Sequence, residues 1–146
     1  MSSTDMPPSV ARRFGYALKR AQHALRLRMD EALRPLSLTT PQYAVLSAVE
    51  AEAGISSAQL ARAAFVTPQT MQGILANMER DGMIARLPDP LHGRILRSEL
   101  TPEGRAILLK AHGAVGDVEE RMLTSLGPEV VASLGEALSK CADDLS

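Results

Sequence analysis

The chain has 146 residues, 45% of them hydrophobic, which is enough for one domain with a buried core. Its net charge of −1 excludes a uniformly basic protein. Its single cysteine, Cys141, excludes an internal disulfide, and no Cys/His spacing resembles a zinc site. The apolar stretches fall far short of the roughly 18 residues of a membrane span, and the polar start MSSTDMPPS lacks a signal-peptide segment. We therefore expect a cytoplasmic protein that needs no metal or cofactor.

The charges are unevenly distributed along the chain. Basic residues dominate the first segment: Arg12, Arg13, Lys19, Arg20, Arg26, Arg28 and Arg34. Acidic residues dominate the last: Asp117, Glu119, Glu120, Glu129, Glu136, Asp143 and Asp144. Because phosphate contacts depend on charges within about one Debye length, a near-neutral chain can still carry a locally basic surface. Ordinary surface scatter is the alternative interpretation.

Two helices are predicted before residue 54. Apolar residues recur at helical spacing from about Ser9 to Arg34, and Pro35 ends that pattern, which indicates one long helix. The pair Thr40-Pro41 then starts a second helix that ends near Gly54.

The segment from Ile55 to Gly82 predicts a helix-turn-helix from its capping residues. Ser56 and Gln59 form a capping box, with Ile55 and Leu60 placed as a hydrophobic staple. Thr67 repeats the device as a hydroxyl N-cap before a proline, with Val66 and Met71 as the second staple.

The second of these helices has two chemically different faces. Met71, Ile74, Leu75 and Met78 recur at spacings of three and four and should point inward. The outer face then carries Gln69, Gln72, Gly73, Ala76, Asn77 and Arg80. Gln and Asn side chains can pair with adenine in the major groove, where a helix-turn-helix presents its second helix. This pattern predicts DNA binding.

A β-hairpin and two further helices should follow. The segments MIARL and RILRSEL, joined by PDPLHG, are predicted as two strands, and a hairpin directly after a helix-turn-helix is a wing. Thr101-Pro102 should cap a helix to about Leu123, and Glu129 to Leu145 a last one with its apolar residues inward: Val130, Val131, Leu134, Leu138, Cys141 and Leu145.

The predicted fold is mainly α with a small β-hairpin wing, in one domain over residues 1–146. A winged helix-turn-helix at 40–101 is flanked by terminal helices at 9–35 and 102–145, which the compact module cannot cover by itself. Pairing with the same helices of a second copy solves this problem, and such a contact would be two-fold symmetric. Two such modules about one DNA turn apart would read a pseudo-palindromic operator in double-stranded DNA.

The chain resembles the MarR family of bacterial transcription regulators. The matching stretches are LSLTTPQYAVLSAV, SSAQLARAAFVTPQTMQGILANMERDGMIAR and PDPLHGRILRSELTPEGR. The resemblance implies an obligate homodimer that represses a nearby promoter and is released by a small aromatic or phenolic ligand. It also implies DNA contacts at Pro68, Gln69, Thr70, Gln72, Gly73, Asn77 and, in the wing, Arg94.

The wing departs from the family pattern at one point. The family has Asp-x-Arg before its second strand, with the acidic residue holding the arginine, whereas this chain has His92-Gly93-Arg94. Either Asp89 substitutes as the brace of Arg94, or the wing is looser than in the family. A solvated arginine at the hairpin tip is the alternative for Arg94 itself.

Several residues have a structural alternative to a functional role. The mid-helix Gly73 suggests close approach of another molecule to the backbone, with core packing as the alternative. Cys141 lies on an apolar stripe next to acidic residues, so we expect burial rather than redox sensing. His23, Tyr16 and Tyr43 either line a ligand pocket between the terminal helices and the module or simply pack there.

Two other functions compete with DNA regulation. A winged helix can bind a protein partner with the same face, and an enzyme site could lie between the terminal helices and the module. The sequence has no phosphate loop or nucleophile elbow, so catalysis is not expected. The acidic residues Asp117, Glu119 and Glu120 are interpreted as a solvated helix face.

Overall fold

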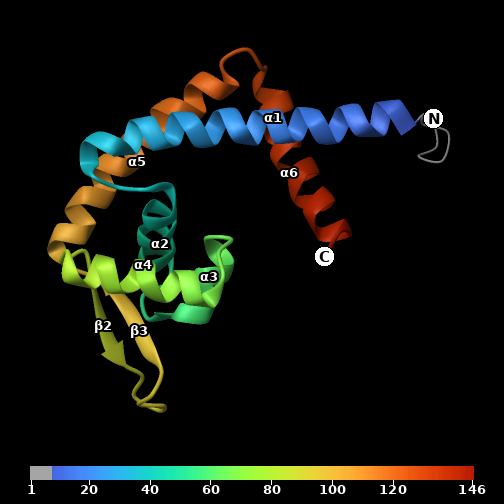
Figure 1. Cartoon of the computed structure of the whole chain (residues 1–146). Helices are drawn as coiled ribbons and strands as arrows, with labels where there is room; N and C mark the ends of the chain where they lie inside the picture. Colours follow the sequence, from blue (N-terminus) through green and yellow to red (C-terminus); the bar gives the residue numbers. More distant parts are fainter. Residues whose placement is uncertain (1–7) are drawn as a thin grey trace.

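The computed structural model describes residues 8–146 and consists of helices around a small winged module (Figure 1). Helix α1 (Pro8–Leu33) leads through a short 3-10 turn, η2 (Arg34–Leu36), to helix α2 (Thr40–Ala51). The predicted bounds of α1 are confirmed to within a residue, whereas α2 ends three residues before Gly54. The helix starts at Thr40, as the Thr40-Pro41 pair predicted, and its N-cap is Thr39, whose side chain accepts a hydrogen bond from the Gln42 backbone.

The winged module contains α2, α3 (Ser57–Ala63), α4 (Pro68–Arg80) and an antiparallel sheet. The sheet has three strands in the order β1-β3-β2 instead of the two that the sequence predicted. Strands β2 (Ile84–Pro88) and β3 (Leu96–Leu100) form the wing, and β1 (Ile55–Ser56) pairs with the middle of β3. This third strand attaches the start of the helix-turn-helix directly to the wing.

Helices α5 (Pro102–Leu123) and α6 (Pro128–Asp144) complete the chain. Thr101 caps α5 as predicted, because its side chain accepts a hydrogen bond from the Gly104 backbone. Helix α5 runs from the wing back to α1, against which it packs (Figure 1). Among residues 8–146, no helix is long and apolar enough to cross a membrane.

One hydrophobic core fills the module and reaches the end of α1. Its largest fully buried side chains come from five helices and strand β2: Leu33, Leu46, Leu60, Met71, Leu75, Met78, Ile84 and Leu108. Gly104 permits the closest approach in this core, since a Cβ there would lie 1.9 Å from the Met83 carbonyl oxygen. The glycine of the Leu-Thr-Pro-Glu-Gly segment is therefore required for α5 to pack on the start of β2.

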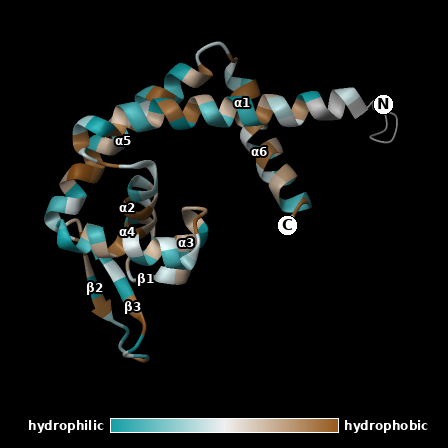
Figure 2. Ribbon diagram, viewed as in Figure 1, coloured by the Kyte–Doolittle hydropathy of each residue, from teal (hydrophilic) through white to brown (hydrophobic). Residues whose placement is uncertain are grey.

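Helix α6 has no buried residue within the single chain, which corrects the prediction that its apolar residues point into a core. Figure 2 shows hydrophobic residues recurring along α6, although the helix stands apart from the winged module. Val130, Leu134, Leu138 and Cys141 are all exposed, as are Phe14 and Tyr16 on α1. The expected burial of Cys141 is therefore not found in one chain.

Candidate nucleic-acid interface

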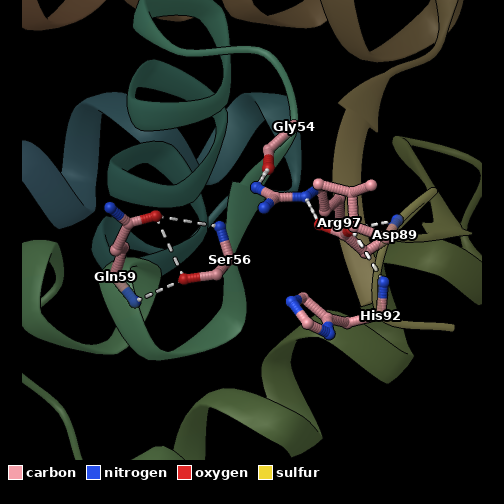
Figure 3. Close-up of polar contacts among 7 residues, drawn as sticks. Gly54, Ser56, Gln59, Asp89, His92 and Arg97 are labelled. Atoms are coloured by element: carbon pink, nitrogen blue, oxygen red, sulfur yellow. Dashed lines mark hydrogen bonds and ion pairs between the residues drawn. The ribbon is translucent and has the colours of Figure 1, made fainter. Parts of the chain in front are cut away.

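The start of α3 is fixed by the predicted capping box (Figure 3). The Ser56 side chain accepts from the Gln59 backbone at 3.3 Å, and the Gln59 side-chain oxygen accepts from the Ser56 backbone at 3.2 Å. Ile55 and Leu60, the expected staple, are both buried. Because Ser56 also belongs to β1, the same residue anchors α3 to the sheet.

The start of α4 is fixed by Thr67, whose side chain accepts from the Thr70 backbone at 3.1 Å. Pro68 occupies the first helical position, as predicted. The turn before this cap contains Phe65, which has a φ of 56° and is 95% exposed. A non-glycine residue in the left-handed region is strained, and no sequence pattern indicated this conformation at Phe65.

The two faces of α4 are arranged as the spacing predicted. Met71, Leu75 and Met78 are buried and Ile74 is partly buried. The outer face is exposed along the whole helix: Pro68, Gln69, Thr70, Gln72, Gly73, Ala76, Asn77 and Arg80. The helix therefore presents amides and a hydroxyl to solvent from a rigid, core-anchored support.

Gly73 is not required by packing inside the chain. A Cβ at this position would meet no atom within 4 Å. The core-packing alternative is therefore wrong for the described part of the chain. The flat surface at Gly73 leaves room for another molecule to approach the backbone of α4.

Two arginines hold amides of the outer face, and the sequence reasoning missed both contacts. Arg86 on β2 donates from Nη1 to the Gln72 Oε1 atom at 3.2 Å, and its Nη2 lies 3.5 Å from Glu79 Oε1. Arg80 donates from Nη2 to Asn77 Oδ1 at 2.7 Å. The i,i+3 spacing of Asn77 and Arg80 could have predicted their contact, whereas Arg86 and Gln72 lie on different elements and no local pattern relates them.

The wing is braced by Asp89, but through Arg97 and not through Arg94. The buried Asp89 carboxylate accepts from Arg97 Nε and from the Leu91 and His92 backbones, the latter two at 2.7 and 3.1 Å (Figure 3). These contacts, led by the Leu91 backbone bond and the Arg97 guanidinium, hold the pKa of Asp89 below its usual value.

Arg97 extends this brace to the module by donating from Nη1 to the Gly54 carbonyl oxygen at 2.6 Å. The proposed substitution of Asp89 as a brace of Arg94 is therefore wrong. Arg94 lies exposed in the loop between β2 and β3, and Asp89 and Arg97 hold the loop end of the two strands. The wing therefore has a carboxylate brace, although it lacks the Asp-x-Arg pattern of the family.

The basic N-terminal segment does not lie at this interface. Its residues belong to α1 and η2, which lie on the opposite side of the module from the wing (Figure 1). The cations around α4 and the wing come from other positions: Arg62, Arg80, Arg86, Arg94 and Arg97. Charge counting along the sequence thus found the wrong basic surface, because it ignored which elements fold together.

The three candidate pocket residues, His23, Tyr16 and Tyr43, have different surroundings within the single chain. Tyr43 on α2 shares a 2.8 Å hydrogen bond with His112 on α5, whose other ring nitrogen lies 2.9 Å from Glu50. Burial raises the pKa of Tyr43. Tyr16 and His23 are exposed on α1. The hydrogen-bonded residues Tyr43, His112 and Glu50 instead join α2 of the winged module to α5.

A separate groove of about 480 Å³ lies between α1 and α5. Its walls include Leu25, Val118 and Met122, and two arginines, Arg28 and Arg121, also line it. Neither Tyr16, His23 nor Tyr43 contributes to it. The acidic Glu31 also lines the groove and lies 3.0 Å from Arg28 Nη1, so the groove is largely apolar with charges of both signs.

Comparison with known proteins relates the chain to a single family. Residues 36–95 match the family model described as MarR family. The HTH-type transcriptional repressor Rv2887 of Mycobacterium tuberculosis is 37% identical over 89% of this chain and 94% of its own length. The transcriptional regulator HosA of Escherichia coli is 39% identical over 63% of this chain and 68% of its own.

Solved structures agree with these relatives. The complex of the Mycobacterium tuberculosis MarR family protein Rv2887 with salicylic acid has a TM-score of 0.73 and 36% identity, covering 94% of this chain and 98% of that one. A mutant of MarR from Escherichia coli in complex with operator DNA has a TM-score of 0.80 and 27% identity, covering 88% and 93%. The chain therefore belongs to the MarR family of bacterial transcription regulators.

Proposed function

We propose that this protein is a sequence-specific DNA-binding repressor that acts as a homodimer on a pseudo-palindromic operator. The observation that carries the proposal is the outer face of α4, which exposes amides and a bare glycine backbone beside a braced wing. Such a helix fits the major groove of B-DNA, and the adjacent hairpin overhangs the flanking minor groove. The operator-bound MarR structure of Escherichia coli supports the same use of this fold.

Each side of the interface has a separate role in this proposal. The α4 residues enter the major groove: Pro68, Gln69, Thr70, Gln72, Gly73 and Asn77. Arg94 inserts into the neighbouring minor groove, where a narrow A·T-rich segment concentrates negative potential. Base contacts on α4 supply sequence preference, while the wing contributes mainly electrostatic affinity.

The dimer is proposed to form through the terminal helices, at 9–35 and 102–145, while residues 40–101 form the DNA-binding module. The exposed apolar residues of α1 and α6 support this division, because such helices gain stability by covering one another in a two-fold contact. Removing the residues after Ser125 should give an aggregating or unfolded product. A well-folded monomer of that truncation in sedimentation analysis would contradict the proposed dimer.

A small aromatic ligand is proposed to release the repressor from DNA. The salicylic acid complex of the mycobacterial relative supports this class of effector. A ligand that binds the DNA-free conformation more tightly lowers operator affinity by the same coupling factor. Titrating salicylate into a preformed protein–DNA complex and following the dissociation by fluorescence anisotropy tests this part.

The DNA-binding function itself is tested by selecting bound sequences from a random DNA pool at moderate salt. We expect an enriched pseudo-palindrome whose half-sites lie about one helical turn apart. A pool that shows no enrichment, together with binding that vanishes at moderate salt, would contradict sequence-specific recognition. A winged helix that binds only a protein partner would give that result.

A further inference from the structure

We propose that Arg86 fixes Gln72 as a hydrogen-bond donor, so that this residue selects guanine over adenine in the operator. The inference rests on the proposed binding of α4 to DNA and assigns the kind of base edge that one residue reads. It starts from a contact between two elements. Arg86 lies on β2, and its guanidinium reaches up to Gln72 and Glu79 on α4.

The orientation of the Gln72 amide follows from the chemistry of its partner. A guanidinium has only N–H donors, so the group that faces Arg86 Nη1 at 3.2 Å must be the amide oxygen. The opposite orientation would place two donors against each other. The Gln72 amide nitrogen therefore points away from Arg86 with both of its hydrogens available.

The surroundings of Arg86 maintain this orientation of the Gln72 amide. Its side chain is 13% exposed, and its second terminal nitrogen lies 3.5 Å from the Glu79 carboxylate. Gln72 and Glu79 are seven residues apart and thus lie on the same edge of the helix. The Arg86 guanidinium contacts both Gln72 and Glu79, so it would lose both contacts if it moved to bind a DNA phosphate.

An amide whose oxygen is turned away from the base reads a different base from an amide that is free to rotate. The bidentate pairing of glutamine with adenine needs the amide oxygen to accept from N6 while the nitrogen donates to N7. A carbonyl oxygen can accept two hydrogen bonds, but the Gln72 oxygen is turned toward Arg86, so the amide hydrogens face the base and would meet the N6 donor of adenine. Guanine presents two adjacent acceptors, N7 and O6, which a pair of amide hydrogens matches.

The experiment first locates the base that Gln72 reads. Operator selection with Gln72→Ala identifies the position at which base preference is lost, relative to the wild-type protein. At that position we expect the wild type to prefer guanine to adenine by about tenfold, in the range of a good base contact. If Gln72→Ala changes no position, or if the wild type selects adenine there, the inference is wrong.

Arg86→Met then tests the positioning role. Methionine keeps an apolar stem beneath α4 but frees the amide oxygen, so the preference should move about tenfold toward adenine. Arg34→Met, at an exposed arginine of η2 on the far side of the module, is the matched control and should leave the preference unchanged. Unchanged base preference in a folded Arg86→Met protein would overturn the proposal.

A second variant tests the same inference without altering the module interior. Gln72→Glu keeps one oxygen on Arg86 and presents the other outward as an acceptor, so the selected base should change to cytosine, whose N4 group donates. Continued selection of guanine by this variant would overturn the proposal. A wild-type protein that enriches no sequence would instead contradict the proposed function, which separates the two failures.

Discussion

Replacing Gly73 by alanine should strengthen the fold and weaken DNA binding at the same time. A mid-helix glycine costs about 0.5–1 kcal/mol relative to alanine, and a Cβ at Gly73 meets nothing within 4 Å of the chain. The free energy of unfolding should therefore rise by about that amount per subunit. Urea unfolding at one fixed protein concentration measures this change, since the midpoint of a dimer depends on concentration.

The same methyl group should obstruct the operator. If DNA approaches the α4 backbone closely, an added methyl acts as overpacking and costs about 1–3 kcal/mol, or at least about fivefold in affinity. Gly113→Ala on α5, with its dimer verified by sedimentation, is the control, because a Cβ there also meets nothing within 4 Å of the chain and the residue lies outside α4 and the wing. Operator affinity that is unchanged in Gly73→Ala would refute the close approach, and a loss of stability would refute the open surface.

Three further predictions concern the core and the wing. Gly104→Ala should lower the free energy of unfolding by about 1–3 kcal/mol, because its Cβ would meet the Met83 carbonyl oxygen. An unchanged free energy of unfolding of this variant in chemical denaturation would contradict that packing. Arg94→Ala should weaken binding to every site and lower the slope of log affinity against log salt by about two for the dimer, and an unchanged slope with unchanged affinity would assign Arg94 to a solvated tip. Because the pKa of Asp89 is lowered in the fold, its carboxylate should stabilise the protein at pH values above its unfolded pKa of about 3.9, and this stability should be lost as the pH falls through the folded pKa. Asp89→Asn should reduce this loss of stability at acidic pH, as measured by denaturation at several pH values. An unchanged pH dependence in the variant would contradict the brace.

The elements that the sequence predicted well are those fixed by neighbouring residues. The capping box of Ser56 and Gln59 and the cap at Thr67 involve residues three apart, so the pattern and the structure agree. The faces of α4 follow from helical periodicity alone. Local chemistry therefore suffices to define the helix-turn-helix and its exposed residues.

The features that were missed depend on contacts across the chain. Strand β1 has two residues and forms by pairing with distant residues of β3: Ile55 pairs with Ser98, 43 positions away, and Ser56 with Arg97, 41 positions away. The wing brace is similar, since Arg97 reaches Asp89 and Gly54 together. A search for an acidic residue next to Arg94 could not find this brace, because it joins residues eight positions apart at the loop end of the wing and then reaches Gly54 on another segment.

The two arginine-held amides of α4 also show why burial decides what an outer face can read. Arg80 and Asn77 are both exposed, so water or a phosphate can replace their mutual bond at little cost and the Asn77 amide can turn to suit a base. Arg86 is largely enclosed and joins a second element, so Gln72 keeps one orientation before DNA arrives. We therefore expect the two amides to differ in base selectivity. Asn77 can rotate to suit its base pair, whereas Gln72 selects one base, because only the oxygen of Gln72 is held by an arginine that is largely buried in the module.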